Sequence, residues 1–268
     1  MTGRHERNDG RKGWKPNVDQ RRKGARRDPD AGSDDWIWGW HAALAALENP
    51  AREPPLRILA TADRARELAA RLPGLAAAEI MERGEIDRHL PAGAVHQGLA
   101  IRTPEPQGAS LDDLTPAPGA VVLMLDQVTD PQNVGAILRS SAAFGAAGVV
   151  LQDRHAPKLT GALAKAAAGA VERLAVVRVV NLSRALETLT EAGWRTVGLA
   201  GGAAEPLADA LDGRPTVLVL GSEGAGLRRL VTEHCDAVAS IPMPGGFESL
   251  NVSNAAAIAL YEASRPRR

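Results

Sequence analysis

The 268-residue sequence lacks several features that would define its class at once. It has a single cysteine, Cys235, so no intrachain disulfide can form and no cysteine pair is available to hold zinc. No uninterrupted apolar run approaches the ~18 residues of a membrane-spanning helix. The charged N-terminus also lacks the apolar core of a secretory signal. We therefore expect a soluble, cytoplasmic protein without a metal site or a membrane anchor.

The chain also lacks net charge, because its 32 basic and 32 acidic residues cancel. This balance would argue against a nucleic-acid partner if the charges were evenly spread. However, residues 1–27 hold ten basic and three acidic residues, a net charge of +7, which leaves −7 on the rest of the chain. Residues 1–34 contain almost no large apolar side chains and are predicted to form a disordered basic tail. Such a tail either attracts nucleic-acid phosphates in a salt-dependent way or only keeps the chain in solution.

The length fits two domains, and a segment rich in proline and glycine separates them at residues 103–119. Before this linker, residues 35–102 follow a β-α-β-α-β pattern, which predicts a small α/β domain. Its predicted helices are residues 41–47 and 63–72, and its predicted strands include residues 56–60 and 95–101.

Residues 120–268 alternate between strands and helices and predict an α/β domain with a parallel sheet. The strands are nearly continuous apolar runs rich in β-branched residues, as buried parallel strands usually are. They are residues 121–125, 148–151, 174–180, 196–199, 216–220 and 237–241. One helical face is marked by Val134, Ile137, Leu138 and Phe144, and another by Leu182, Leu186 and Leu189.

Three polar segments each follow a strand of this second domain. The first runs from Asp126 to Arg139 and has Asn133 near the start of a helix, where it could cap that helix. The second has three glycines within six residues, Gly221 to Gly226, and its glycines allow close approach of the backbone. The third leads from Pro242 to a cap at Ser249 or Asn251. Because ligands bind beyond the carboxyl ends of parallel strands, these segments should converge on one site.

Each segment also has a structural interpretation. Arg139 could be an ordinary surface residue of its helix, and a glycine-rich turn alone is weak evidence for a binding site. The glycine order differs from the G-x-G-x-x-G turn that a dinucleotide-binding enzyme would carry after its first strand, so an oxidoreductase of that type is disfavoured. His234 beside Cys235 is more typical of a helix end than of a metal pair, and His96 could be structural or contact RNA.

Together, the three segments resemble the three motifs of the SpoU (TrmH) family of RNA ribose 2′-O-methyltransferases. The matching stretches are Asn133-Val-Gly-Ala-Ile-Leu-Arg139, Leu220-Gly-Ser-Glu-Gly224, and Ile241-Pro-Met243 with Ser249-Leu-Asn251-Val-Ser253. In the first domain, Trp38-Gly39-Trp40-His41 and Val95-His96-Gln97-Gly98 resemble the ribosomal-protein-like RNA-binding domain of the RlmB subgroup. The family usually has Tyr-Gly where this chain has Trp38-Gly39. Members restricted to a tRNA D-loop guanosine generally lack that domain.

The resemblance implies a SPOUT fold, in which the chain end threads a loop to form a deep trefoil knot, an exception to the usual unknotted connections. It also implies S-adenosyl-L-methionine as the cofactor, held in a bent pose by backbone around the second and third motifs. The residues expected to bind the cofactor are Leu199, Ala200, Leu220, Gly221, Gly224, Ile241, Met243 and Leu250. Phe247 could close the cofactor loop or stack on a base.

By the same resemblance, Arg139 activates the ribose hydroxyl, and four further residues orient it or shape the pocket: Asn133, Glu223, Ser249 and Asn251. Arginine has a pKa above ~12 and is a poor general base. We therefore expect Arg139 to position the phosphate or the 2′-oxygen and to stabilise developing alkoxide charge. Family members are homodimers whose sites form across the interface, which suits an alanine-rich last helix.

The expected substrate is a guanosine of 23S rRNA, either free or in a ribosome assembly intermediate. Two alternatives stay open at this point. The enzyme could methylate a tRNA ribose or another rRNA position, or the chain could be an RNA-binding relative that has lost catalysis.

Overall fold

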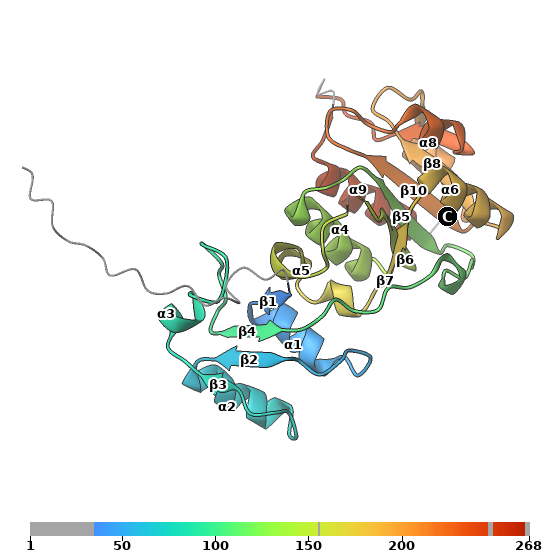
Figure 1. Cartoon of the computed structure of the whole chain (residues 1–268). Coiled ribbons are helices and arrows are strands. Elements are labelled where there is room, and N and C mark those ends of the chain that lie inside the picture. The colour runs from blue at the N-terminus through green and yellow to red at the C-terminus, as the bar shows by residue number, and fades with distance from the viewer. Residues whose placement is uncertain (1–34, 155, 246–248, 266–268) are drawn as a thin grey trace, which may run out of the picture.

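The computed structural model describes residues 35–154, 156–245 and 249–265, which form two sheets with flanking helices (Figure 1). The predicted basic tail lies outside the described residues. No helix within the described part of the chain is long and apolar enough to cross a membrane.

The first sheet has four strands in the order β1-β4-β2-β3. Its elements are β1 (Trp36–Trp38), α1 (Trp40–Glu48), β2 (Arg57–Ala60), α2 (Ala62–Arg71), β3 (Glu79–Ile80), α3 (Arg83–Ile86) and β4 (Leu99–Arg102). The central strand β4 is antiparallel to β1 and β2, whereas β3 is parallel to β2. Alternate side chains are buried on opposite faces: Ile37 packs with α1 and α2, and Trp36 and Trp38 pack on the other face.

The predicted strand at residues 95–101 is wrong at its start, because β4 begins only at Leu99. Gln97 and Gly98 both have positive φ angles, 55° and 84°, which strand geometry excludes. His96 stabilises this turn, since its Nδ1 accepts a hydrogen bond of 3.0 Å from the backbone N–H of Gly98.

The second sheet has seven strands, all paired in parallel, in the order β7-β6-β5-β10-β8-β11-β9. They are β5 (Val121–Asp126), β6 (Gly148–Gln152), β7 (Ala175–Val179), β8 (Arg195–Leu199), β9 (Glu205–Pro206), β10 (Thr216–Gly221) and β11 (Ala237–Ser240). The six predicted strands are confirmed, to within one or two residues at their ends. The two-residue β9 carried no apolar run and was not predicted.

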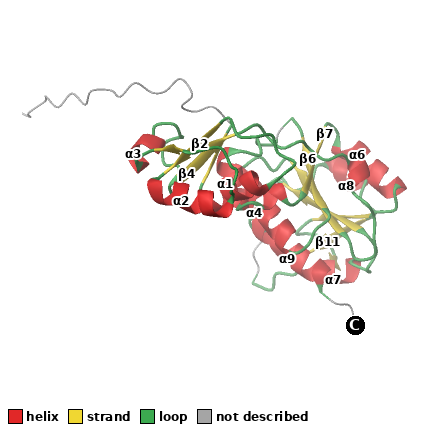
Figure 2. Ribbon diagram, turned by 90° about the horizontal axis from the view of Figure 1, so that it is seen from below, coloured by secondary structure: helices red, strands yellow, loops and turns green. Residues whose placement is uncertain are grey.

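Helices cover both faces of the second sheet (Figure 2). One face is covered by α4 (Pro131–Ala143), α5 (Gly161–Ala167), α7 (Leu207–Ala210) and α9 (Val252–Ser264). The other is covered by α6 (Leu182–Glu191), α8 (Arg229–Glu233) and the 3-10 helix η1 (Leu111–Asp113) of the predicted linker. A further 3-10 helix, η2 (Ala170–Glu172), follows α5. The predicted apolar face of α6 is buried, as is that of α4 except for Phe144, which is 39% exposed.

Helix α4 begins at Pro131, two residues before the predicted cap Asn133. The cap is Asp130, whose carboxylate accepts hydrogen bonds from the backbone N–H groups of Gln132 and Asn133. Proline at the first helical position explains the earlier start, because its fixed φ suits a helix and its missing N–H would have no partner there. The side chain of Asn133 is thereby left available for other contacts.

Helix α5 and a buried ion pair connect the two sheets. Ala164 of α5 packs into the core of the first sheet. Arg52, after α1, forms two hydrogen bonds of 2.8 and 2.9 Å with the carboxylate of Glu172, in η2, and the two side chains are only 3% and 5% exposed. Asn49 donates to the same carboxylate at 2.9 Å. A bidentate pair with a further donor has a defined geometry, so it fixes the first sheet against the second.

Candidate functional site

A cavity of about 360 Å³ lies where β8, β10 and β11 end. The structure brings all eight residues that were predicted to bind the cofactor to this one cavity: Leu199, Ala200, Leu220, Gly221, Gly224, Ile241, Met243 and Leu250. Ser249 and Glu223 also line it, and Val252 and Ala255 of α9 complete the wall. The carboxyl ends of three parallel strands thus form a pocket, as in other open α/β sheets. Phe247 lies outside the described residues.

Glycines shape the loop after β10. A Cβ atom at Gly221 would lie 2.0 Å from the carbonyl carbon of Gly226, so no side chain fits there. Gly224 and Gly226 have positive φ angles of 82° and 66°, which glycine adopts without strain. The chain therefore folds back on itself between Ser222 and Gly226, which pair in an isolated β-bridge. Five residues of this turn line the cavity: Gly221, Ser222, Glu223, Gly224 and Gly226.

Three side chains from the three motifs form a hydrogen-bonded group beside the cavity, here named the polar triad: Asn133, Glu223 and Asn251. The Nδ2 atom of Asn251 lies 2.6 Å from Oε1 of Glu223 and 3.0 Å from Oδ1 of Asn133. Asn133 in turn donates from Nδ2 to Oε1 of Glu223 at 3.2 Å. Asn251 also caps α9, because its Oδ1 accepts from the backbone N–H of Ser253. The predicted convergence of the motifs is therefore present in the structure.

A second set of hydrogen bonds holds the glycine loop against the end of β5. Asp126, the fully buried last residue of β5, accepts hydrogen bonds from the backbone N–H and the Nε of Arg228, at 2.9 and 2.7 Å. Arg228 also donates to Oε1 of Gln152 at 3.2 Å. The sequence analysis missed this pair. Its one signal was a charged residue directly after the apolar run of β5.

Arg139 does not reach the cavity of its own chain. Its side chain is exposed on α4 and lines a separate hollow with His41 and Arg173. Six residues separate it from Asn133, a rise of about 9 Å and a rotation that leaves the two side chains about 120° apart around the helix. A single chain therefore joins Asn133, Glu223, Ser249 and Asn251 at the cavity but leaves Arg139 on another face.

The remaining candidates have structural surroundings. Burial raises the pKa of the Cys235 thiol to about 12, so it is neutral and a poor nucleophile. His234 contacts the carbonyl of Leu230 and the carboxylate of Glu187, and the carbonyl contact is the main cause of its raised pKa. Within the described residues there is no group of three or more His, Cys, Asp or Glu that could hold a metal ion.

His96 is 5% exposed, and its ring bridges the Gly98 N–H and the carboxylate of Asp87, whose Oδ1 lies 3.2 Å from Nε2. Burial lowers its pKa, against the opposing effect of Asp87. These contacts give His96 a structural role in the turn before β4.

The sequence of this chain is similar to those of known proteins. Residues 120–261 match the model of the SpoU rRNA Methylase family. An uncharacterized tRNA/rRNA methyltransferase of Mycolicibacterium gilvum is 44% identical over 194 residues, which are 70% of this chain. The match spans 61% of that relative's length, so the chain is similar to only part of it.

Solved structures show the same architecture. The SpoU methyltransferase AviRb from Streptomyces viridochromogenes, crystallised with its cofactor AdoMet, has a TM-score of 0.71 and 28% identity, over 85% of this chain and 88% of its own. An RNA 2′-O ribose methyltransferase has a TM-score of 0.69 and 27% identity, over 85% of this chain and 86% of its own. Because the family model covers more than half of the chain and includes every residue of the cavity, the chain belongs to the SpoU rRNA Methylase family.

Proposed function

We propose that this protein is an S-adenosyl-L-methionine-dependent methyltransferase that modifies the ribose 2′-hydroxyl of a guanosine in 23S rRNA, as members of the RlmB subgroup do. The observation that carries the proposal is the meeting of the three motifs at one cavity, with the polar triad at its side. The AdoMet bound by AviRb and the ribose activity of the second solved relative support the cofactor and the reaction.

The cavity suits this cofactor. Leu199, Leu220, Ile241 and Leu250 offer apolar surface for a flat adenine ring. The glycine loop offers backbone donors and acceptors for polar edges, and Gly221 lets the loop fold back on itself because the backbone of Gly226 takes the place of its Cβ. We infer that this loop and the segment that contains residues 241–245 and 249–251 contribute to the trefoil knot of the family, with the Asn251–Glu223 hydrogen bond holding the two together.

Bound S-adenosyl-L-methionine would supply an activated methyl group: the 2′-oxygen would take it by in-line displacement at the sulfonium carbon, with S-adenosyl-L-homocysteine as the leaving group and the hydroxyl proton passing to water. The protein must align the oxygen with the methyl group and stabilise the charge that develops on the oxygen. The polar triad shapes the rim where the ribose enters. Arg139 holds the phosphate or the 2′-oxygen and stabilises the alkoxide.

A homodimer supplies Arg139 to the cavity. In a single chain this residue lies on another face of α4, so the site of one copy is completed by the Arg139 of a second. Helices α4 and α9 pack side by side and leave three large side chains partly exposed, Phe144 at 39%, Ile258 at 41% and Tyr261 at 56%. Such apolar groups support pairing of two copies through this face. Sedimentation of the full chain measures the oligomeric state.

Residues 35–102 serve as the RNA-binding domain, joined by the linker to the catalytic domain at residues 120–268. The two solved relatives each align with 85% of this chain. Residues 120–268 make up little more than half of the chain, so the alignment must also include earlier residues. That shared N-terminal part favours rRNA over tRNA. The enzyme acts in the cytoplasm, on free rRNA or on a ribosome assembly intermediate.

The test is transfer of tritiated methyl groups from S-adenosyl-L-methionine to 23S rRNA fragments and, in parallel, to bulk tRNA. Label on the ribose of a 23S guanosine is the expected result. The M. gilvum relative is described for both RNA classes, so label on tRNA alone would replace the proposed substrate by a tRNA ribose. Absence of label together with absence of cofactor binding in calorimetry would identify an inactive RNA-binding relative.

A further inference from the structure

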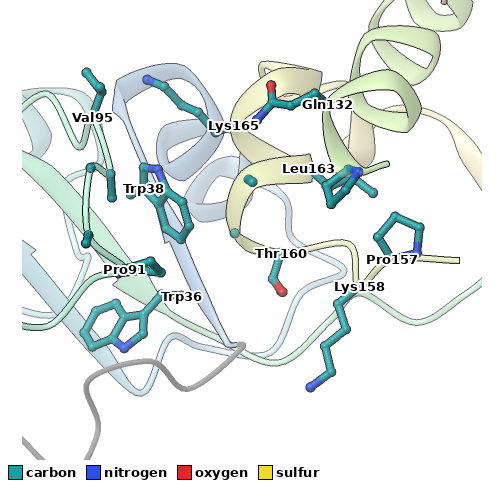
Figure 3. Close-up of a pocket in the computed structure, with 16 residues that line it drawn as sticks. Trp36, Trp38, Pro91, Val95, Gln132, Pro157, Lys158, Thr160, Leu163 and Lys165 are labelled. Carbon is teal, nitrogen blue, oxygen red and sulfur yellow. The ribbon is translucent and has the colours of Figure 1, made fainter. Parts of the chain in front are cut away.

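A second cavity, of about 620 Å³, lies between the two sheets and is here named the inter-sheet cleft. One wall comes from β1 and residues 91–95, and the other from residues 157–165 and the first turn of α4. Figure 3 shows Trp38 on one side, facing Leu163 and Pro157 on the other. Neither the cofactor nor the polar triad accounts for this cleft, because the two cavities share no lining residue.

The chemistry of the inter-sheet cleft selects for an anion with a flat apolar part. Its walls are mainly proline and alanine, with Trp36 and Trp38 behind them at 0% and 8% exposure, and none of the described residues that line it is acidic. Two lysines, Lys158 and Lys165, lie on different parts of the rim (Figure 3). Burial lowers the pKa of Lys165, whose Nζ donates to Oε1 of Gln97 at 2.9 Å, so this ammonium is partly desolvated. A partly desolvated cation gains more from a nearby anion than one in bulk water does.

The cleft also lies next to the proposed reaction centre. Gln132 lines it, whereas the next residue, Asn133, belongs to the polar triad. Consecutive residues of a helix differ by about 100° in direction, so the first turn of α4 presents one side chain to the cleft and the other to the triad. A ligand strand that fills the cleft would continue past α4 towards the ribose that reacts.

The two walls are held in place before any ligand binds. The buried Arg52–Glu172 pair and Ala164 of α5 fix the first sheet against the second. A cleft whose walls are already fixed loses less entropy on binding than one that must close.

From this geometry we infer that the inter-sheet cleft binds an unpaired nucleotide of the RNA substrate, adjacent in the strand to the nucleotide that is methylated. The base lies between the apolar walls, and the phosphates on either side of it lie near the two lysines. The inference rests on the proposed function, because it takes RNA as the substrate. Proteins that read RNA sequence commonly take up unstacked bases in this way, so the cleft would contribute to the choice of substrate.

The experiment uses the full chain and two variants, Ala92→Trp to fill the cleft and Lys158→Glu to reverse one charge. Both positions are exposed, so neither change disturbs a core. Matched controls are Val180→Trp, at a side chain that is 82% exposed, and Arg184→Glu, on α6 at the opposite face of the second sheet. The readouts are anisotropy of a short fluorescein-labelled single-stranded RNA, methyl transfer to 23S rRNA fragments, cofactor affinity by calorimetry, and mapping of crosslinks from thiouridine-substituted RNA.

We expect Ala92→Trp to weaken RNA binding about 5- to 150-fold, the range for loss of one stacked base, and Lys158→Glu to weaken it through charge repulsion, while the controls and all cofactor affinities stay unchanged. Crosslinks should fall on residues 91–95 and 157–165. Suppose that the wild-type protein methylates RNA and that the cleft variants bind RNA as tightly as the controls do. This result overturns the inference and leaves the proposed function standing. That result would assign the cleft to another occupant, such as a peptide. A wild-type protein that neither binds nor methylates RNA overturns both.

Discussion

The cofactor cavity and the inter-sheet cleft are built in different ways. The cavity comes from one edge of one sheet, and its lining residues lie between Leu199 and Ala255. The cleft needs one wall from β1 and residues 91–95 and another from α4, α5 and the loop before α5, with lining residues from Trp36 to Lys165. The cavity combines glycine backbone with the carboxylate of Glu223, whereas the described residues of the cleft include lysines and no carboxylate. If the two proposed assignments hold, cofactor binding is local to the second sheet, while RNA binding depends on how the two sheets are joined.

The largest expected effect is that of Arg139→Ala, which should lower methyl transfer without changing cofactor binding. Arg139→Ala should lower methyl transfer to rRNA about 10²- to 10³-fold, the usual loss when one electrostatic donor of a transition state is removed. Cofactor affinity should not change, because the proposed role of Arg139 is to hold the phosphate or the 2′-oxygen of the RNA, and the eight residues proposed to bind the cofactor do not include it. Single-turnover methyl transfer and calorimetry measure the two quantities. The matched control is Arg184→Ala, an exposed arginine on the opposite face; equal rates for the two variants would remove Arg139 from the catalytic site.

Substitution of Gly221 should weaken cofactor binding and leave RNA binding unchanged. Gly221→Ala places a Cβ 2.0 to 2.4 Å from the backbone of Gly226 and Leu227, so the loop must shift. Such overpacking costs about 1–3 kcal/mol, and a cost of this size in the cofactor-binding conformation lowers cofactor affinity about 5- to 150-fold. Gly202→Ala is the control on the same sheet edge, because a Cβ there meets no atom within 4 Å. If Gly221→Ala binds the cofactor as tightly as the control, the loop does not line the adenine pocket.

Removal of residues 1–27 should weaken RNA binding and leave cofactor binding unchanged. The segment carries a net charge of +7. Each phosphate contact to a single strand contributes about 0.7 to the slope of log affinity against log salt, so the deletion should weaken rRNA binding several-fold and flatten that slope. Cofactor affinity should be unchanged. A full-length chain with its ten basic tail residues changed to glutamine separates charge from length, and an unchanged slope in both variants would leave the tail only a solubilising role.

The smallest effect concerns the pH dependence of stability in the first sheet. The pKa of buried His96 is lowered, so the unfolded chain binds a proton more readily than the folded one. Its contribution to stability is therefore present above the unfolded pKa and is lost as the pH falls below about 6.5. His234 acts in the opposite direction, since its pKa is raised. Urea unfolding of wild type and His96→Gln from neutral to mildly acidic pH should show a smaller loss in the variant; parallel curves would contradict the assignment.

The sequence predicted the second sheet well because buried parallel strands are continuous apolar runs, and these runs mark each strand without reference to the rest of the fold. The convergence of the three polar segments was predicted because the carboxyl ends of parallel strands meet at one edge. The eight residues of the cavity were named by the resemblance to the family. The choice between two neighbouring helix caps was harder to predict. Asp130, rather than Asn133, caps α4 because Pro131 can begin a helix, and both residues are favourable caps by composition.

Contacts between distant residues could not be predicted from one sequence. Arg52 and Glu172 lie 120 residues apart, and Asp126 and Arg228 lie 102 apart, so no local pattern relates either pair. The position of Arg139 was missed for another reason. The resemblance supplied its role, but only the three-dimensional structure shows that it faces a hollow other than the cofactor cavity.

We propose that the cavity at the ends of β8, β10 and β11 serves methylation of one guanosine ribose in 23S rRNA. A ribose-methylation map of all rRNA and tRNA, compared between a wild-type and a deletion strain, decides whether it does. One 23S guanosine should lose its 2′-O-methyl group in the deletion strain. The wild-type gene should restore that group, and Arg139→Ala should not. Loss of methylation at a tRNA ribose, or an unchanged map, would rule out a 23S guanosine as the substrate.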